Sequence, residues 1–295
     1  MATKRKAAKR PAAARKAKRP ATRSIRQATS LATSSRQDVA SRLSALAEMP
    51  MTGEDDAHLR AVLAVVVNTS EPIAVRLAAL QTLQTASFSS AAFPAFRGDY
   101  IAALRTLTQD PDPELRQRVL GFLAREKDGF AQKKLLEGLR DPAKALVPPE
   151  KALQLLSYDV HAEAYPIARA IVSKPPNPTA RREALRLLAA DAKAAPMFER
   201  LLRDKDETRE IRQISAAALQ ATKPDTLQKH AREILLDPSE QDEIQATCLT
   251  ALTQFGNTEA VAGDTTLMKR IERLRGKASS NVKRSARQFL TKYGR

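Results

Sequence analysis

The sequence predicts an all-α fold built from stacked helical pairs, and three observations support this prediction. The composition favours helices, because only 9 of the 295 residues are glycine and 4% are aromatic, while Ala, Leu, Gln, Arg and Lys, which lose little rotamer freedom in a helix, are abundant. Apolar residues recur at helical spacing in seven similar segments. Successive segments lie 31 to 40 residues apart, which indicates a repeated helix–turn–helix unit.

The seven segments align without gaps on a start residue that is followed in most of them by Arg or Lys. The start residues are Val75, Leu115, Pro148, Ala180, Ile211, Ile244 and Val282. The residue four positions after the start is small in six segments, and a leucine stands eight positions after every start. These leucines are Leu83, Leu123, Leu156, Leu188, Leu219, Leu252 and Leu290. Small residues let neighbouring helices approach, and leucines fill the space between layers, so each segment is expected to be the second helix of a pair.

Turn residues divide the chain between these helices. Capping side chains with Pro in the first turn, as in Asp112-Pro113 and Asn177-Pro178, predict helix starts. Partner helices are expected at 54–68, 98–109, 129–140, 162–173, 194–203, 225–236 and 264–276. A further helix at about 37–48 is expected to cap the N-terminal end of the stack. Because Pro149 stands where other segments have a basic residue, we expect an irregular joint there.

The order of an Asp/Pro turn, an apolar residue, Arg and then small-x-x-x-Leu resembles the HEAT-repeat family over residues 54–294. The resemblance implies a right-handed α-solenoid of about seven helical pairs within 37–295, with the second helices on the concave face. It also suggests a structural ladder of basic residues near the turns, formed by Arg76, Arg116, Arg181 and Arg212 together with Lys283. The expected partners of this ladder are turn acids, namely Asp110, Asp112, Asp204 and Asp206.

The net charge of +17 is concentrated at the two ends of the chain. Residues 1–36 carry 12 Lys/Arg and no acid, residues 269–295 carry 10 Lys/Arg and one acid, and the part between them has a net charge of −4. Residues 1–36 lack apolar periodicity, so we expect a disordered basic tail. The tail resembles those of linker histones and bacterial histone-like proteins, and its two basic clusters resemble a bipartite nuclear localisation signal.

Basic segments bind polyanions by releasing condensed counterions, and both ends are candidates for this interaction. The candidate contacts in the tail are Lys4, Arg5, Lys6, Lys9, Arg10, Arg15, Lys16, Lys18 and Arg19. Those in the C-terminal cap at 269–295 are Lys269, Arg270, Arg273, Arg275, Lys283, Arg284 and Arg287. The alternatives are a tail that only keeps the protein in solution and a cap whose charge only covers the end of the stack.

No pattern of residues predicts catalysis, a cofactor or a metal site. His58, His161 and His230 lie in different repeats without a second ligand at metal spacing, so each is expected at the surface or an interface. Cys248 occupies a small position of its segment and is expected to be a buried packing residue. DNA glycosylases of the HEAT type use aromatic residues, including tryptophan, beside a catalytic Asp; without tryptophan, this class is a remote alternative.

These observations predict a non-enzymatic scaffold that binds a protein or peptide on the solenoid surface. The basic tail would tether it to nucleic acid or another polyanion. The alternative is a DNA- or RNA-binding protein whose solenoid positions two basic ends on a phosphate backbone. One cysteine and no apolar run of membrane-spanning length favour an intracellular protein, cytoplasmic or nucleoid-associated, or nuclear in a eukaryote. A mitochondrial transit peptide is an alternative for the tail, and the sequence leaves the oligomeric state open.

Overall fold

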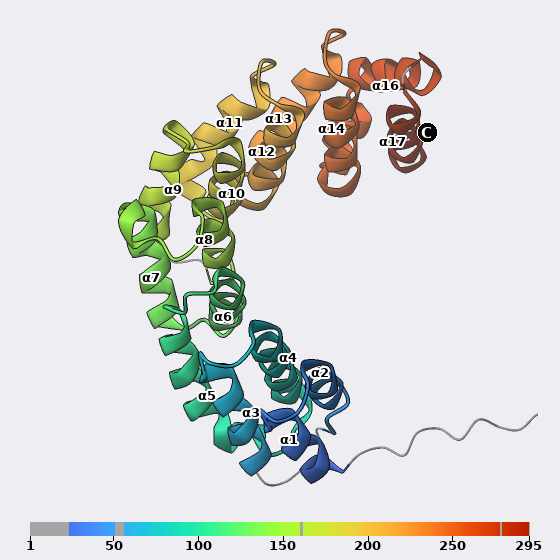
Figure 1. The fold of residues 1–295 in the computed structure, drawn as a ribbon. Coiled ribbons are helices and arrows are strands. Elements are labelled where there is room, and N and C mark those ends of the chain that lie inside the picture. Colours follow the sequence, from blue (N-terminus) through green and yellow to red (C-terminus); the bar gives the residue numbers. More distant parts are fainter. Residues whose placement is uncertain (1–23, 51–55, 160–161, 278, 295) are drawn as a thin grey trace, which may run out of the picture. The chain divides into compact units, whose positions relative to one another are not determined.

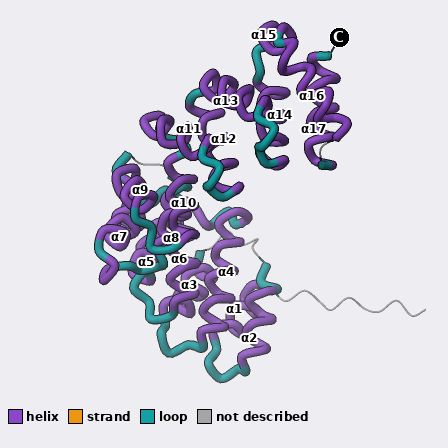
Figure 2. The backbone as a smooth tube through the Cα atoms, turned by 90° about the horizontal axis from the view of Figure 1, so that it is seen from above, coloured by secondary structure: helices purple, strands orange, loops and turns teal. Residues whose placement is uncertain are grey.

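The computed structural model describes residues 24–50, 56–159, 162–277 and 279–294. Over these ranges the regular structure consists of α-helices and two short 3₁₀ helices, without a strand, which confirms the predicted all-α class (Figures 1 and 2). In the same ranges no helix is long and apolar enough to cross a bilayer. The basic candidates from Lys4 to Arg19 lie outside the described residues.

The longer helices follow one another in twos along the chain, and in each of these pairs we term the first helix the A helix and the second the B helix. The A helices are α1 (Ile25–Thr33), α3 (Ala57–Val67), α5 (Phe93–Leu107), α7 (Gly129–Arg140), α9 (Ala164–Ser173), α11 (Ala195–Arg203), α13 (Pro224–Leu236) and α16 (Thr265–Lys277). The B helices are α2 (Val39–Ala47), α4 (Ile73–Ser89), α6 (Pro113–Arg125), α8 (Pro149–Leu156), α10 (Pro178–Leu188), α12 (Arg209–Thr222), α14 (Asp242–Phe255) and α17 (Ser280–Tyr293). Short helices lie between them: η1 (Pro142–Lys144), η2 (Ala192–Ala194) and α15 (Thr258–Gly263).

The chain divides into two compact units, Met1–Ala103 and Leu104–Arg295, with the boundary inside α5. In the first unit α1 packs on α3 and α2 on α4. In the second unit the B helices α6, α8, α10, α12, α14 and α17 pack one after another, while α7 packs on α9, α11 on α13 and α13 on α16. Each unit is therefore a stack of helical hairpins with the B helices in one layer and the A helices in the other (Figure 1). The predicted stacking of helical pairs is confirmed within each unit.

The repeat positions recognised in the sequence form the core between layers. All seven residues four positions after a segment start are buried, from Ala79 to Ala286. The leucines eight positions after the start are at most 2% exposed in six repeats. Leu290 in α17 is half-buried, because no other described helix packs over its outer side. Small side chains thus allow close contact of helices, and the leucines supply most of the buried apolar area between layers.

The predicted boundary of the tail at residue 36 is wrong, because α1 begins at Ile25. Ser24 and Gln27 form a capping box: the Gln27 backbone N–H donates to Ser24 Oγ at 3.3 Å and the Ser24 backbone N–H to Gln27 Oε1 at 3.1 Å. Ala28 and Ala32 are fully buried on the face where α1 meets its neighbours. The helix at 39–47 therefore belongs to an eighth pair, α1–α2, and is not a single capping helix.

The joint at Pro149 is irregular, as the sequence predicts. The Asp141 side chain accepts a hydrogen bond from the Ala143 backbone and begins η1, which separates α7 from α8. Pro149 occupies the first position of α8, where its missing N–H costs no helical hydrogen bond. This B helix has only 8 residues, and it begins later in its segment than the B helices of the other segments do.

Candidate functional site: the B-helix face of the second unit

Arginines of three B helices hydrogen-bond to the A helices of their pairs. In three pairs the fourth residue of the B helix is an arginine whose Nε donates to the carbonyl of the next-to-last residue of its A helix. These contacts join Arg42 to Ala32, Arg76 to Val66 and Arg212 to Leu202, each with an N–O distance of 2.9 Å. Carbonyl groups at the end of a helix lack a partner within that helix, so the guanidinium caps the A helix.

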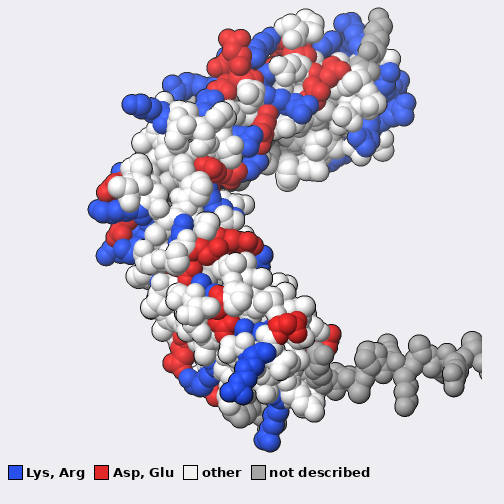
Figure 3. Space-filling model, viewed as in Figure 1, with Lys and Arg blue, Asp and Glu red and all other residues white. Residues whose placement is uncertain are grey.

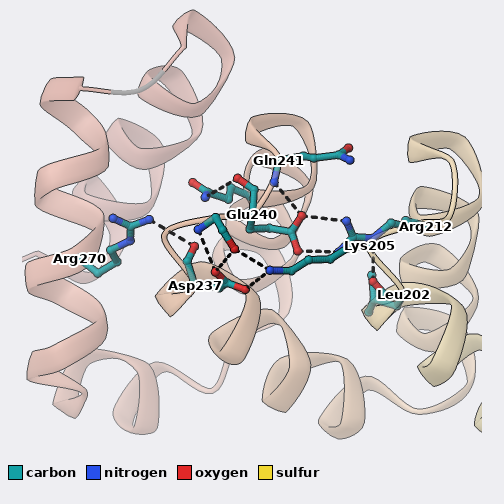
Figure 4. Close-up of polar contacts among 9 residues, drawn as sticks. Leu202, Lys205, Arg212, Asp237, Glu240, Gln241 and Arg270 are labelled. Carbon is teal, nitrogen blue, oxygen red and sulfur yellow. Dashed lines mark hydrogen bonds and ion pairs between the residues drawn. The ribbon is translucent and has the colours of Figure 1, made fainter.

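The same arginine position reaches forward to the next layer. Its partner there is a glutamate four residues before the start of the next segment, which we term the acid position. The ion pairs are Arg42 with Glu71, Arg181 with Glu207 and Arg212 with Glu240. In Figure 4 the guanidinium of Arg212 faces the carboxylate of Glu240, at N–O distances of 2.8 and 2.6 Å. Arg212 is 0% and Glu240 2% exposed, so this pair is shielded from water.

Where the acid position holds no acid, the arginine uses main-chain oxygens. Lys144 occupies that position after α6, and Arg116 donates instead to the carbonyls of Asp110 at 2.6 Å and Pro111 at 2.9 Å. The structure thus places all four predicted ladder arginines inside the stack. The prediction that turn aspartates pair with the ladder arginines is wrong for Arg181 and Arg212. Glu207 and Glu240 at the acid position pair with these two arginines instead. Asp112, one of the predicted turn acids, accepts a hydrogen bond from the Leu115 backbone N–H and so caps α6.

Arg42 is a ladder residue that the sequence analysis missed. It lies 34 residues before Arg76, which is within the spacing of the repeat. Ala45 and Leu46 follow at the expected small and apolar positions, but Met49 replaces the leucine at the eighth position. The spacing of the arginines was therefore the signal that could have revealed the α1–α2 pair.

With the arginines turned into the stack, the outer side of the B helices in the second unit is left for other contacts. A groove of about 570 Å³ lies on this side between α12, α14 and α17. Its wall residues on α12 and α17 include Ala217 and Ser285, and its floor on α14 exposes small side chains such as Thr250. Phe255 stands at one end of α14 and is 51% exposed. We term this hollow the B-helix groove.

Ion pairs link neighbouring B helices beside the groove. The Arg182 guanidinium of α10 contacts Glu210 of α12 at 3.0 Å, and Arg209 of α12 contacts Glu243 of α14 at 3.4 Å. Arg284 of α17 holds the same repeat position as Arg182, two residues after a segment start. Its guanidinium donates to Asn281 Oδ1 in its own helix at 2.8 Å, and no carboxylate of the described chain pairs with it. The groove therefore contains a cation without an acidic partner.

The C-terminal cap carries further unpaired cations. Lys and Arg side chains gather over α16 and α17 in Figure 3. Five of the predicted contacts in this cap are exposed and Lys283 is half-buried: Lys269, Arg273, Arg275, Lys283, Arg284 and Arg287. In the part of the chain that the structure describes, none of these six forms an ion pair. The positive potential of this end is therefore not neutralised from within the fold.

Arg270 differs from the other predicted contacts of the cap. Its Nε donates to the Leu235 carbonyl at 3.0 Å, near the end of α13. Its Nη2 donates to the Asp237 carbonyl at 3.4 Å (Figure 4). Arg270 is half-buried and joins α16 to the preceding layer through these two hydrogen bonds. The Asp237 side chain accepts from Lys205, and this contact holds the pKa of Asp237 well below its usual value.

His58, His230 and the cysteine are buried within the helical layers. His230 is buried between α11 and α13, with Nε2 3.4 Å from Glu199 and Nδ1 3.2 Å from Glu233. His58 is buried in α3, and His161 lies outside the described residues. Cys248 is fully buried, and burial raises the pKa of its thiol to about 12. Among the described residues no three His, Cys, Asp or Glu side chains are grouped so as to hold a metal ion.

Comparisons with known proteins find similarity only at the level of solved structures. No protein-family model matches the sequence, and no curated protein is significantly similar to it. Human deoxyhypusine hydroxylase, in complex with glycerol, is 15% identical with a TM-score of 0.35, over 81% of this chain and 96% of that one. The complex of CpcE and CpcF of phycocyanin lyase from Nostoc sp. PCC7120 gives 15% identity and a TM-score of 0.40, over 95% and 99%. At these values neither likeness assigns an activity or a partner.

Proposed function

We propose that this protein is a non-catalytic scaffold that binds a protein partner on the B helices of its second unit. The observation that carries this proposal is the B-helix groove, which leaves small and apolar side chains of α12, α14 and α17 open. The buried contact of Arg212 with Glu240 lies inside the stack, and the exposed pair of Arg209 with Glu243 lies at the edge of the groove, so neither covers its floor. A concave surface lined with apolar side chains and a few polar groups is typical of a binding site.

Site-specific crosslinking tests this proposal on the full-length protein. A photoreactive amino acid at Ala217 on α12 is expected to capture a protein partner from nuclease-treated cell extract. The same amino acid at Lys229, an exposed residue of the A helix α13, serves as the control and is expected to capture much less. Mass spectrometry of the crosslinked products identifies the partner. Capture from Lys229 alone, or from neither position, would contradict the proposed face.

Nucleic-acid binding is a second candidate function, and one observation favours it. The six cations of α16 and α17 remain without ion pairs in the described fold, and the chain carries a further basic segment at residues 1–23. Phosphate backbones bind such surfaces through counterion release, which gives a strong dependence on salt. The folded part would then bind nucleic acid directly, in addition to any tethering by the tail.

A salt titration with duplex DNA distinguishes direct binding from tethering. We expect residues 24–295 to retain DNA binding with a steep negative slope of log K against log salt concentration. Substitution of Lys283, Arg284 and Arg287 by Gln is expected to reduce the slope by about 0.9 for each phosphate that the variant no longer neutralises. Binding by the full-length protein alone would show that the tail is sufficient. Failure of both proteins to bind at low salt would exclude both roles.

A further inference from the structure

We propose that the B-helix groove is the docking site for an amphipathic helix of a partner protein that carries a carboxylate facing Arg284. This proposal rests on the proposed protein-binding function and specifies its surface and its partner. It depends on three features of the groove: the small side chains on its floor, the apolar anchor at its end and the unpaired cation in its wall.

The floor has the shape that a helix requires. Along α14, the groove is lined from Glu243 to Phe255 by residues that recur every three or four positions, which is one face of that helix. This face spans about 18 Å, enough for about three turns of an incoming helix. Between its ends the floor consists of Ala246, Thr247, Thr250 and Ala251 with Gln254. Side chains this small let a second helix lie close to the α14 backbone.

The end of the groove supplies an apolar contact. Phe255 is half-exposed there although it lies on a helix whose other aromatic and aliphatic side chains are largely buried. Leu227 of α13 lies at the same end and is buried, which gives the pocket an apolar base. A large apolar residue of a partner would cover the Phe255 ring. Exposed aromatic residues at the edge of a cavity are frequent anchors in protein interfaces.

The charge of the wall selects the partner. At the repeat position of Arg284, Arg182 receives the Glu210 carboxylate from the next B helix. Arg284 has no such carboxylate in the described fold, and Lys283 and Arg287 beside it add positive potential. Glu243, the acidic residue of the groove, already pairs with Arg209 at 3.4 Å. The partner is therefore expected to offer Asp or Glu at the α17 side.

This combination favours a protein helix over nucleic acid as the occupant of the groove. Ala and Thr side chains on the floor offer no donors to phosphate comparable with those of Arg and Lys. A single unpaired cation lines the groove itself, whereas the remaining basic residues of the cap lie outside its lining. An amphipathic helix matches the small side chains of the floor, the exposed Phe255 ring and the lone cation, and such helices commonly bind grooves through residues at i, i+3, i+4 and i+7.

Selection from a displayed library of 20-residue helical peptides on the full-length protein tests the proposal. Selected peptides are expected to share an apolar stripe and an Asp or Glu on one flank. Their affinity, measured by fluorescence anisotropy of the labelled peptide, is expected to fall about tenfold or more for Thr250→Arg, which fills the floor, and for Arg284→Glu. Replacing the acidic residue of the peptide by Lys is expected to restore affinity for Arg284→Glu.

The matched control is Arg273→Glu, which reverses the same charge on α16 outside the groove and is expected to change affinity less than twofold. Equal losses for Arg273→Glu and Arg284→Glu would overturn the proposal in favour of general attraction to the basic cap. The proposal would also be overturned if no acidic helical peptide were selected. It would be overturned as well if sedimentation showed that self-association of the protein closes the groove. If crosslinking at Ala217 still captures a partner in those cases, the scaffold function stands and only the helix site is lost.

Discussion

Substitution of Glu240 by alanine is expected to lower the free energy of unfolding by about 3–5 kcal/mol. Its partner Arg212 is fully buried and would keep its charge in the core with two guanidinium N–H groups unpaired. The arginine holds the end of α11 through Leu202 as well, so it cannot move to solvent without breaking that hydrogen bond. Urea unfolding of the full-length variant, followed by circular dichroism at the helical minimum, measures the loss.

Two further variants isolate the cause. Glu243→Ala removes the exposed ion pair between Glu243 and Arg209. The free energy of unfolding is expected to fall by about 0–1 kcal/mol in this variant. The double substitution Arg212→Met with Glu240→Leu removes both buried charges and is expected to recover much of the stability lost by Glu240→Ala. If Glu240→Ala lowered the free energy of unfolding as little as Glu243→Ala, the Arg212–Glu240 pair would not stabilise the contact between its two layers.

Leu188→Ala is expected to destabilise the protein by about 2–5 kcal/mol, because it removes a fully buried side chain between layers and leaves a cavity. The same substitution at Leu290, the equivalent repeat position in α17, is expected to cost clearly less, since that side chain is half-buried. Both residues lie on helices, where alanine is well tolerated, so helix propensity does not separate them. The difference between the two losses of stability therefore measures the contribution of the layer that covers Leu188 and not Leu290.

The two leucine variants are compared by urea midpoints at equal unfolding slopes. A loss at Leu290 as large as that at Leu188 would mean that a further surface covers α17 in solution. A dependence of the Leu290 result on protein concentration would identify a second copy of the chain as that surface. Without such a dependence, equal losses would contradict the packing described for α17.

The helical pairs and their core could be predicted from the sequence, because the 3.6-residue period fixes which side chains share a face. Leu188 and Leu219 illustrate this, since spacing alone placed both in the core. The α1–α2 pair was missed because the buried residues of α1, Ala28 and Ala32, are alanines, which carry little apolar signal beside a strongly basic tail. Its capping box at Ser24 and the arginine at 42 are the local signals that mark this pair in the sequence.

The sequence placed Arg181 and Arg212 at the turns between layers, but it did not identify Glu207 and Glu240 as their carboxylate partners. Periodicity places Arg212 near a turn, yet it does not say which turn of the next layer meets it. Glu240 lies 28 residues further along the chain, and its position depends on how one hairpin stacks on another. The B-helix groove was missed for the same reason. It arises from the separation of α12, α14 and α17 in space, which no single segment of sequence specifies.

The pairing between layers determines which repeats the chain can lose or exchange. Each Arg–Glu contact begins in one hairpin and ends in the next, so removing one hairpin breaks two contacts and brings their remaining halves together. Excising α11–α12 would remove Glu207 and Arg212 together and leave Arg181 to meet Glu240. Excising α13–α14 would instead strand Arg212, because the following repeat brings no acid at the corresponding place. Duplication or loss of repeats in this chain is thus constrained by the matching of Arg and Glu across the new junction, in addition to the packing of apolar side chains.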